Sequence, residues 1–335
     1  MAEKNRVRKI VFFITKLLVT AVIIAVLIRN LGWSAIVSTV SGANPLWLLA
    51  GAVVFLISGW LGVVQWRMIL ENRGLSLPFW RVFKLYFVGM FFNNFIMGGI
   101  VGDAVKVASI HSRDGKGMTG FAATFLDRFA GLWALCGFAV IGSFILLSRG
   151  MLTHGNIGTA VIALFCAFVL FAGIMLFLVS KPLQTLFFSV TDRISLCRKF
   201  KVKEIVSEVL IEARDFKLMS SVALLALLTQ FLRIGSNILI AASLGLVTAA
   251  NFQYFFIFIP IIAMLITVPL PFGAREAFGG VLFSMAGFQR DAAFIMGFLA
   301  TIIAIAVSSL GGIFFVTEKI YKSGNKNDLS AKSAN

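Results

Sequence analysis

The chain has 335 residues and a formal net charge of +16, from 30 Lys and Arg against 14 Asp and Glu. Only 13% of the residues are charged, 59% are hydrophobic, and the mean hydropathy is +0.97. A soluble globular domain carries about 25% charged residues, and disordered chains are poor in apolar residues. The composition therefore excludes both classes and indicates a polytopic membrane protein. The three cysteines suggest neither a disulfide framework nor a metal site, and we expect no cofactor.

Six apolar segments approach or exceed the roughly 20 residues that a helix needs to cross a bilayer. Their apolar residues run continuously instead of alternating, which favours helices over a membrane barrel. Lys16 interrupts the first segment, so we do not expect a removable signal peptide. The predicted fold is all-α with six full spans, at 10–28, 45–66, 129–147, 157–179, 218–246 and 292–316.

Two further apolar stretches, 82–101 and 252–270, end in helix breakers and charged residues. If each dips into the membrane and returns, 23 of the 30 basic residues lie on the cytoplasmic side, together with both termini. This distribution satisfies the positive-inside rule, so we expect two re-entrant helical hairpins. The alternative is that both stretches are ordinary irregular loops.

The resulting order of elements repeats itself. Residues 1–150 would form three spans with a hairpin at about 82–110 entering from the cytoplasm, and residues 151–320 would form three spans with a hairpin at about 252–290 entering from outside. An odd number of crossings in each half inverts the second half, and inverted repeats with broken helices are typical of transporters. Residues 321–335 are predicted to be a disordered cytoplasmic tail.

Arg233 lies near the middle of the span 218–246. Gln230 and Asn237 share its helix face, because residues three and four positions apart are neighbours on a helix. A charge inside a membrane is costly and usually faces a cavity or a partner, so this face is a candidate binding surface. The alternative is a structural arginine paired with a buried acid.

Charged residues also occur at two other places within or beside the expected membrane segments. Asp103, after a glycine-rich stretch, could pair with a basic group or act as the N-cap of the returning helix. Asp127 and Arg128 open the third span, where the alternative is an interfacial pair with Arg128 reaching the lipid headgroups.

Arg275 and Glu276 lie at the expected tip of the second hairpin, after Pro269 and Pro271. A helix starting near Ala274 would direct its positive dipole end into the membrane. Together with Arg275, that end could receive a phosphate. Glu276 would neutralise Arg275 or exchange a proton.

No Walker A loop, Ser-His-Asp pattern or HExxH motif is found. The largest loop, 181–217, has the pattern of a basic amphipathic helix that suits an anionic lipid surface. We therefore expect neither an enzyme nor a nucleic-acid-binding protein.

Three segments resemble motifs of a known family. The segment 86–106 contains Asn93, Asn94 and Asp103, with Lys106 three residues further on, and the segments 123–132 and 269–276 contain the other charged pairs. In this order they resemble the lysylphosphatidylglycerol synthase transmembrane (flippase-like) family, over roughly residues 10–316.

Some positions depart from the family pattern. Met97 stands where the family has proline, and Val101 where it has glycine. Lys106 replaces an arginine, and Asp127 replaces the usual glutamate. These changes mostly preserve charge, so they bear on which lipid is carried more than on membership.

The resemblance implies a lipid-translocating membrane domain. In family members fused to a soluble aminoacyltransferase, this domain is thought to flip aminoacylated phosphatidylglycerol; no such soluble domain is present here, so aminoacyl transfer is not expected. We predict a transporter of phospholipids, or of other anionic or aminoacylated lipids, in a bacterial or archaeal inner membrane. The alternatives are a polyprenyl-phosphate or glycolipid carrier, a lipid-modifying transferase and a non-transporting lipid-binding subunit, and homo-oligomerisation is left open. The candidate lipid-binding residues are Asn93, Asn94, Asp103, Lys106, Asp127, Arg128, Gln230, Arg233, Asn237, Arg275 and Glu276.

Overall fold

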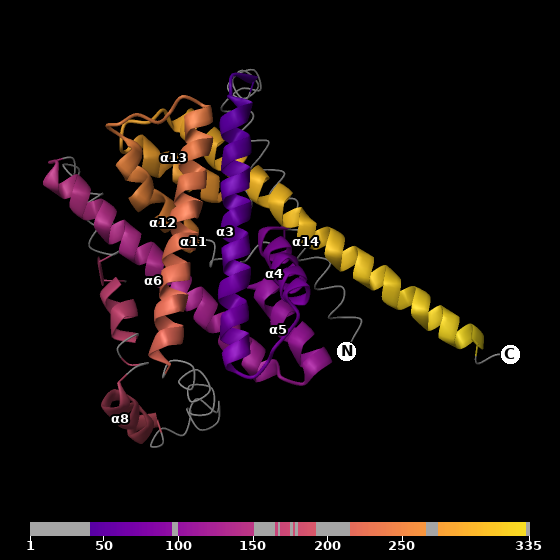
Figure 1. Cartoon of the computed structure of the whole chain (residues 1–335). Helices are drawn as coiled ribbons and strands as arrows, with labels where there is room; N and C mark the ends of the chain where they lie inside the picture. Colours follow the sequence, from indigo (N-terminus) through magenta and orange to yellow (C-terminus); the bar gives the residue numbers. More distant parts are fainter. Residues whose placement is uncertain are drawn as a thin grey trace, which may run out of the picture.

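The computed structural model describes residues 41–95, 100–150, 165–166, 168–174, 177, 180–191, 215–265 and 274–332, and these residues form helices and turns without a strand (Figure 1). The predicted span at 10–28 lies outside the described residues, and so does most of the span at 157–179. The helices are α3 (Pro45–Asn72), α4 (Phe79–Phe95), α5 (Val101–Asp114), α6 (Gly117–Ser148), α8 (Lys181–Thr191), α11 (Phe216–Ser243), η1 (Phe252–Tyr254), α12 (Phe255–Leu265), α13 (Ala274–Ser284) and α14 (Arg290–Lys332).

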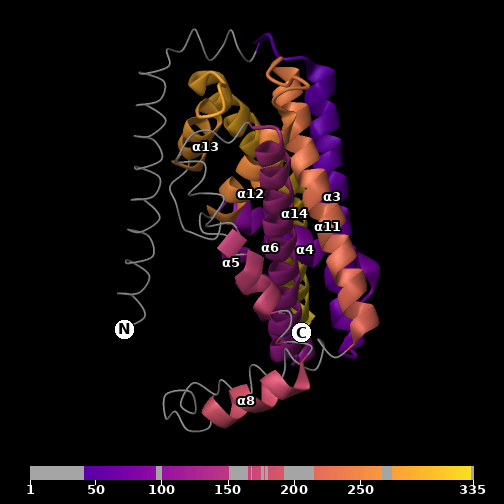
Figure 2. The ribbon, with the colours of Figure 1, turned by 90° about the vertical axis from the view of Figure 1, so that its left-hand side faces the viewer.

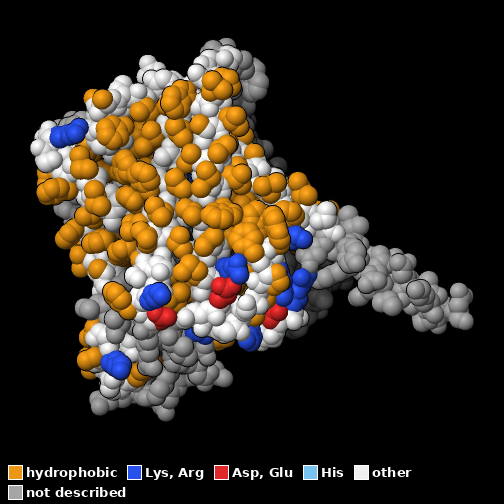
Figure 3. All heavy atoms as spheres, in the orientation of Figure 1, with side chains coloured by type: hydrophobic (Ala, Val, Ile, Leu, Met, Phe, Trp, Pro, Cys, Tyr) orange, Lys and Arg blue, Asp and Glu red, His pale blue; other side chains and the backbone are white. Residues whose placement is uncertain are grey.

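Four of these helices are long and apolar enough to cross a membrane: α3, α6, α11 and the Arg290–Thr317 part of α14. They cover four of the six predicted spans. Figure 3 shows a broad apolar surface over the bundle, with most of the charged side chains gathered toward one end. The protein is therefore a multi-pass membrane protein.

The helix starts follow from local sequence. The Asn44 side chain accepts a hydrogen bond from Leu46 N (2.9 Å) ahead of α3, with Pro45 in the first turn. Asp215 accepts in the same way from Leu218 N (3.0 Å) at the start of α11. Both side chains satisfy a backbone N–H that has no partner within the helix.

Two boundaries differ from the sequence prediction. Helix α6 begins at Gly117, twelve residues before the predicted span, so Asp127 and Arg128 lie inside the helix instead of opening it. Other helices form hydrogen bonds with both side chains, so α6 can continue through these charged residues. Helix α14 continues to Lys332 where a disordered tail was expected over 321–335; residues 318–332 contain no proline to end it.

Helices α3 and α11 lie side by side and run antiparallel (Figures 1 and 2). Asn44 N donates to Ser243 O (2.8 Å) at one end of the pair, and the Ser236 hydroxyl donates to Gly51 O (2.8 Å) further along. This pair forms one wall of the bundle.

Each of the other two long helices follows a pair of short helices. In the first pair, α4 and α5 start and finish at the same end of the bundle, because Arg81 at the start of α4 forms an ion pair with Asp114 at the end of α5 (2.6 Å). In the second pair, the Phe255 ring at the start of α12 lies 6.0 Å from the Phe288 ring just after α13.

The two halves keep a constant spacing along the chain. Helices α4 and η1 begin at residues 79 and 252, and α6 and α14 at 117 and 290, a separation of 173 for both pairs. Helix α13 is described from residue 274, 173 residues after the start of α5 at 101. The packing also corresponds, since α6 packs on α12 and α14 packs on α4. The spacing thus relates the starts of these helices along the chain.

Small residues allow the helices to approach closely, as is common where helices pack within membranes. A β-carbon on Gly102 of α5 would lie 1.8 Å from the carbonyl oxygen of Gly89 on α4. A β-carbon on Gly311 of α14 would lie 2.0 Å from the carbonyl oxygen of Phe87. Backbone atoms cannot yield as a side chain can, so both contacts require glycine.

The substitution Gly311→Ala should therefore separate α14 from α4. We expect it to lower the free energy of unfolding by at least about 1–3 kcal/mol, the usual cost of overpacking. Gly235→Ala is the matched control: a β-carbon there meets nothing within 4 Å, and alanine favours helix by up to about 1 kcal/mol over glycine. Thermal unfolding of both purified variants in detergent measures the difference, and equal stability would contradict the close contact.

Candidate functional site

One cavity of about 420 Å³ lies among helices α3–α6 and α11–α14. Its lining includes apolar side chains such as Phe55, Leu132 and Ile262. It also brings together all of the candidate lipid-binding residues of the sequence analysis, which are Asn93, Asn94, Asp103, Lys106, Asp127, Arg128, Gln230, Arg233, Asn237, Arg275 and Glu276.

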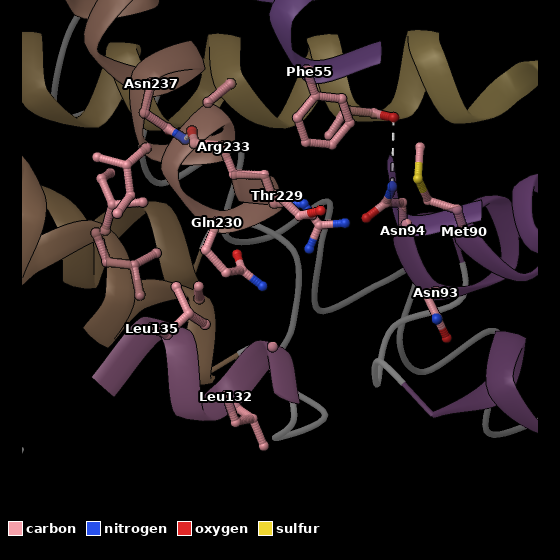
Figure 4. Close-up of a pocket in the computed structure, with 18 of the residues that line it drawn as sticks. Phe55, Met90, Asn93, Asn94, Leu132, Leu135, Thr229, Gln230, Arg233 and Asn237 are labelled. Atoms are coloured by element: carbon pink, nitrogen blue, oxygen red, sulfur yellow. Dashed lines mark hydrogen bonds between the residues drawn. The ribbon is translucent and has the colours of Figure 1, made fainter. Parts of the chain in front are cut away.

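Helix α11 contributes a polar face to this cavity. Figure 4 shows Thr229, Gln230 and Arg233 projecting from α11 toward the space beside α4 and α6. The Asn237 amide is turned back to its own helix, where it donates to the carbonyl oxygen of Arg233 (2.9 Å). Its amide therefore holds the helix backbone beside Arg233.

Arg233 is the least compensated charge of the site. Its Nε atom is buried and makes no hydrogen bond, and the Thr229 hydroxyl one turn earlier is in the same state. Within the part of the chain that the structure describes, no carboxylate lies within ion-pair distance of Arg233. The alternative of a structural arginine paired with a buried acid is thus not what the described residues show.

Asp103 is the centre of a charge cluster at the start of α5. Its carboxylate accepts from Arg128 of α6 (Nε to Oδ2, 2.7 Å) and lies 3.1 Å from the Lys106 ammonium. The N-cap expectation for Asp103 is wrong, because Asp103 is the third residue of α5. Asn93 takes over that task, since its side-chain oxygen accepts from Gly102 N (2.8 Å).

Asp127 and Arg128, adjacent in sequence, have different partners. Asp127 is buried and accepts a hydrogen bond from Gln65 of α3 (3.0 Å). Arg128 turns to Asp103 instead. The alternative of an interfacial Asp127–Arg128 pair is therefore replaced by two contacts that tie α6 to α3 and to α5.

Lys106 is nearly inaccessible, with 4% of its side chain exposed. Its ammonium lies 5.0 Å from the ring centre of Trp66 and 4.9 Å from that of Tyr86. Trp66 is itself fixed by a hydrogen bond from its Nε1 to the Thr124 hydroxyl (3.2 Å). Cation–π attraction and the ion pair to Asp103 together hold this ammonium in one place.

The second half supplies a corresponding charge pair. Glu276, the third residue of α13, is buried and pairs with Arg275 (2.9 Å). Thr301 of α14 donates to Glu276 (2.6 Å) and accepts from the Arg275 guanidinium. Helix α13 is described from Ala274 onward, and Pro269 and Pro271 lie outside the described residues.

Asn94 connects the two halves at the cavity. Its amide donates to the carbonyl oxygen of Ala304 on α14 (3.4 Å), the dashed line of Figure 4. This contact joins the first short-helix pair to the last long helix.

Four polar residues that matter here were missed from the sequence. Each is a polar side chain inside an apolar segment, which is the signal that could have found them; they are Gln65, Tyr86, Thr229 and Thr301. These groups are neutral, yet Gln65 and Thr301 form hydrogen bonds with charged residues of the cavity and the Tyr86 ring lies beside the Lys106 ammonium.

The cavity holds four cationic side chains and three carboxylates. At neutral pH with every group ionised, it would carry one excess positive charge. The described residues include no group of three or more His, Cys, Asp and Glu able to hold a metal ion. The arrangement can therefore receive an anion, with apolar walls beside it.

The fold and this cavity define a class: multi-pass membrane proteins that enclose a charged cavity between helices. The model of the lysylphosphatidylglycerol synthase TM region matches residues 13–312, and the chain belongs to this family. The family points to a membrane function related to lipids. Neither the curated proteins nor the solved structures that were searched give a match to this chain.

The Thr301 hydroxyl should contribute measurably to stability. Thr301→Val keeps the shape but removes the contacts to Arg275 and Glu276, so we expect the free energy of unfolding to fall by about 1–3 kcal/mol. Thr229→Val is the matched control, because Thr229 is equally buried (5% against 6% exposed) and its hydroxyl has no partner. Thermal unfolding in detergent should show a loss for Thr301→Val alone; a loss of equal size in both variants would contradict the hydrogen-bond network.

Proposed function

We propose that this protein moves a phosphate-bearing lipid between the leaflets of the inner membrane and leaves the lipid chemically unchanged. The observation that carries the proposal is Arg233, a guanidinium inside a membrane bundle without an ion-pair partner among the described residues. Family membership supports a lipid as the ligand.

An unpaired cation inside a membrane protein raises the free energy of the folded protein, because neither water nor a counter-ion compensates the charge fully. A lipid phosphate would supply that counter-ion. A guanidinium matches phosphate with two parallel hydrogen bonds, and the Thr229 hydroxyl offers a further donor. The apolar lining of the cavity suits the first part of the acyl chains.

We further propose six full spans, two re-entrant hairpins and an inverted repeat, with both termini cytoplasmic. The contacts between the start of α4 and the end of α5, and between the start of α12 and the end of α13, support hairpins that return to the side they entered. The constant spacing of 173 residues and the antiparallel α3–α11 pair support an inverted repeat. A cavity between two such broken elements is where transporters bind their substrates.

At low concentrations of the transported lipid, Arg233→Gln should slow transport by about ten- to a hundredfold. Hydrogen bonds to a charged group contribute about 1.5–3 kcal/mol, and the substitution removes them. The measurement uses liposomes containing the purified protein and fluorescent phosphatidylglycerol, with a polyprenyl-phosphate and a glycolipid in parallel. Arg149→Gln, an exposed arginine at the end of α6, is the control that should leave the rate unchanged.

Equal rates for Arg233→Gln and the natural protein would reject Arg233 as the phosphate ligand. Faster movement of the polyprenyl-phosphate or the glycolipid would select that lipid class instead. Mass spectrometry of the recovered lipids separates transport from chemistry, because a modified lipid would identify a transferase.

The hairpins can be tested by labelling single cysteines, in a variant whose natural cysteines are replaced by serine. Asn72→Cys and Ser112→Cys flank the first short-helix pair, whereas Ala249→Cys and Gln289→Cys flank the second; all four positions are exposed. A membrane-impermeant maleimide applied to intact cells after outer-membrane permeabilisation should label only the second two. Labelling of positions 72 and 112 from opposite sides would show that the α4–α5 segment crosses the membrane once instead of returning.

A further inference from the structure

We infer that Lys106 is a positioning residue that frees Arg128 to bind the lipid phosphate together with Arg233. This inference rests on the proposed function and names the groups that carry it out. It starts from the fact that Asp103 has two cationic partners, although one carboxylate balances only one positive charge.

The two partners differ in mobility. The Lys106 ammonium is 4% exposed and lies between the rings of Trp66 and Tyr86. Its stem packs against Gly89, where a β-carbon would come within 2.9 Å of Lys106 Cγ. Lys106 is therefore fixed at Asp103.

Arg128 has 43% of its side chain exposed and lines the cavity. A long side chain with this exposure can turn from a carboxylate to a phosphate within the same cavity. When it does so, Asp103 keeps the Lys106 ammonium 3.1 Å away and is not left as an uncompensated buried charge, which would be strongly unfavourable.

Arg233 of the neighbouring helix α11 lines the same cavity as Arg128. Gly131, one turn after Arg128 on α6, lies against Gln230 of α11, since a β-carbon on Gly131 would be 3.0 Å from the Gln230 amide nitrogen. Arg233 follows one turn after Gln230. Arg128 thus enters the cavity one turn before this contact and Arg233 one turn after it. We place the phosphate between these two levels, where both long guanidinium side chains can reach it.

The second half lacks this arrangement. The position equivalent to Lys106, 173 residues later, is Gly279, which carries no charge. Arg275 donates to both Glu276 and Thr301 in that half. The geometry thus assigns the movable phosphate ligand to the first half.

The test uses the full chain in detergent and a soluble short-chain phosphatidylglycerol, with affinity measured by calorimetry. Lys106→Met leaves Arg128 as the cation that balances Asp103, so the affinity should fall about tenfold, as for the loss of a close charge interaction. Neutralising Asp103 in the same chain, as Asp103→Asn with Lys106→Met, should release Arg128 and restore the affinity to within about threefold, a coupling that a double-mutant cycle detects.

Lys84→Met, an exposed lysine on α4 outside the cavity, is the control that should bind normally. Asp103→Asn alone keeps the test valid if Lys106→Met does not fold, because it should bind at least as tightly as the natural chain. Weakened binding in Asp103→Asn, or no rescue in the double variant, would overturn the assignment while leaving the proposed function intact. Absence of binding by the natural chain, with no transport in liposomes, would overturn both.

Discussion

The Asp103 carboxylate is the interaction on which the first half of the site depends. It lies where α4, α5 and α6 meet, with Asn93 of α4 at 3.5 Å, Lys106 of α5 at 3.1 Å and Arg128 of α6 at 2.7 Å. A carboxylate with only 14% of its side chain exposed needs such partners, since removing one leaves a charge uncompensated in surroundings of low polarity. The close backbone contact of Gly89 with Gly102 brings the two short helices near enough for this cluster to form. Packing and charge pairing thus require each other.

The second half reaches a comparable result with different chemistry. Glu276 is again the third residue of a short helix, and its long-helix partner is again 25 residues further along, but that partner is the hydroxyl of Thr301 instead of a guanidinium. The excess positive charge of the cavity is therefore concentrated at Arg128 and Arg233. This uneven distribution gives the site its capacity for an anion, which the net charge of the chain does not reveal.

The sequence was sufficient for some elements because their signals are local. Continuous apolar runs predicted α3, α11 and the membrane part of α14; the capping side chains Asn44 and Asp215, which set the starts of α3 and α11, are also local signals. The charged residues of the cavity could be found as well, because each stands out in an apolar segment. Which of them pair could not be predicted: Asp127 and Arg128 are adjacent in sequence, yet their partners, Gln65 and Asp103, lie 62 and 25 residues away. The early start of α6 escaped prediction for the same reason, since distant groups make its charges tolerable inside a helix.

The 173-residue spacing has a consequence for the distribution of charge in the cavity. A shift of 173 residues maps Asp103 onto Glu276, which is also charged, but it maps Lys106 onto Gly279, Asp127 onto Ala300 and Arg128 onto Thr301, which are not. A symmetric pore would present the same field to an ion arriving from either side. Here the charges do not follow the spacing of the helix starts, so an anion inside the cavity faces different charges toward α5 and α6 than toward α13 and α14.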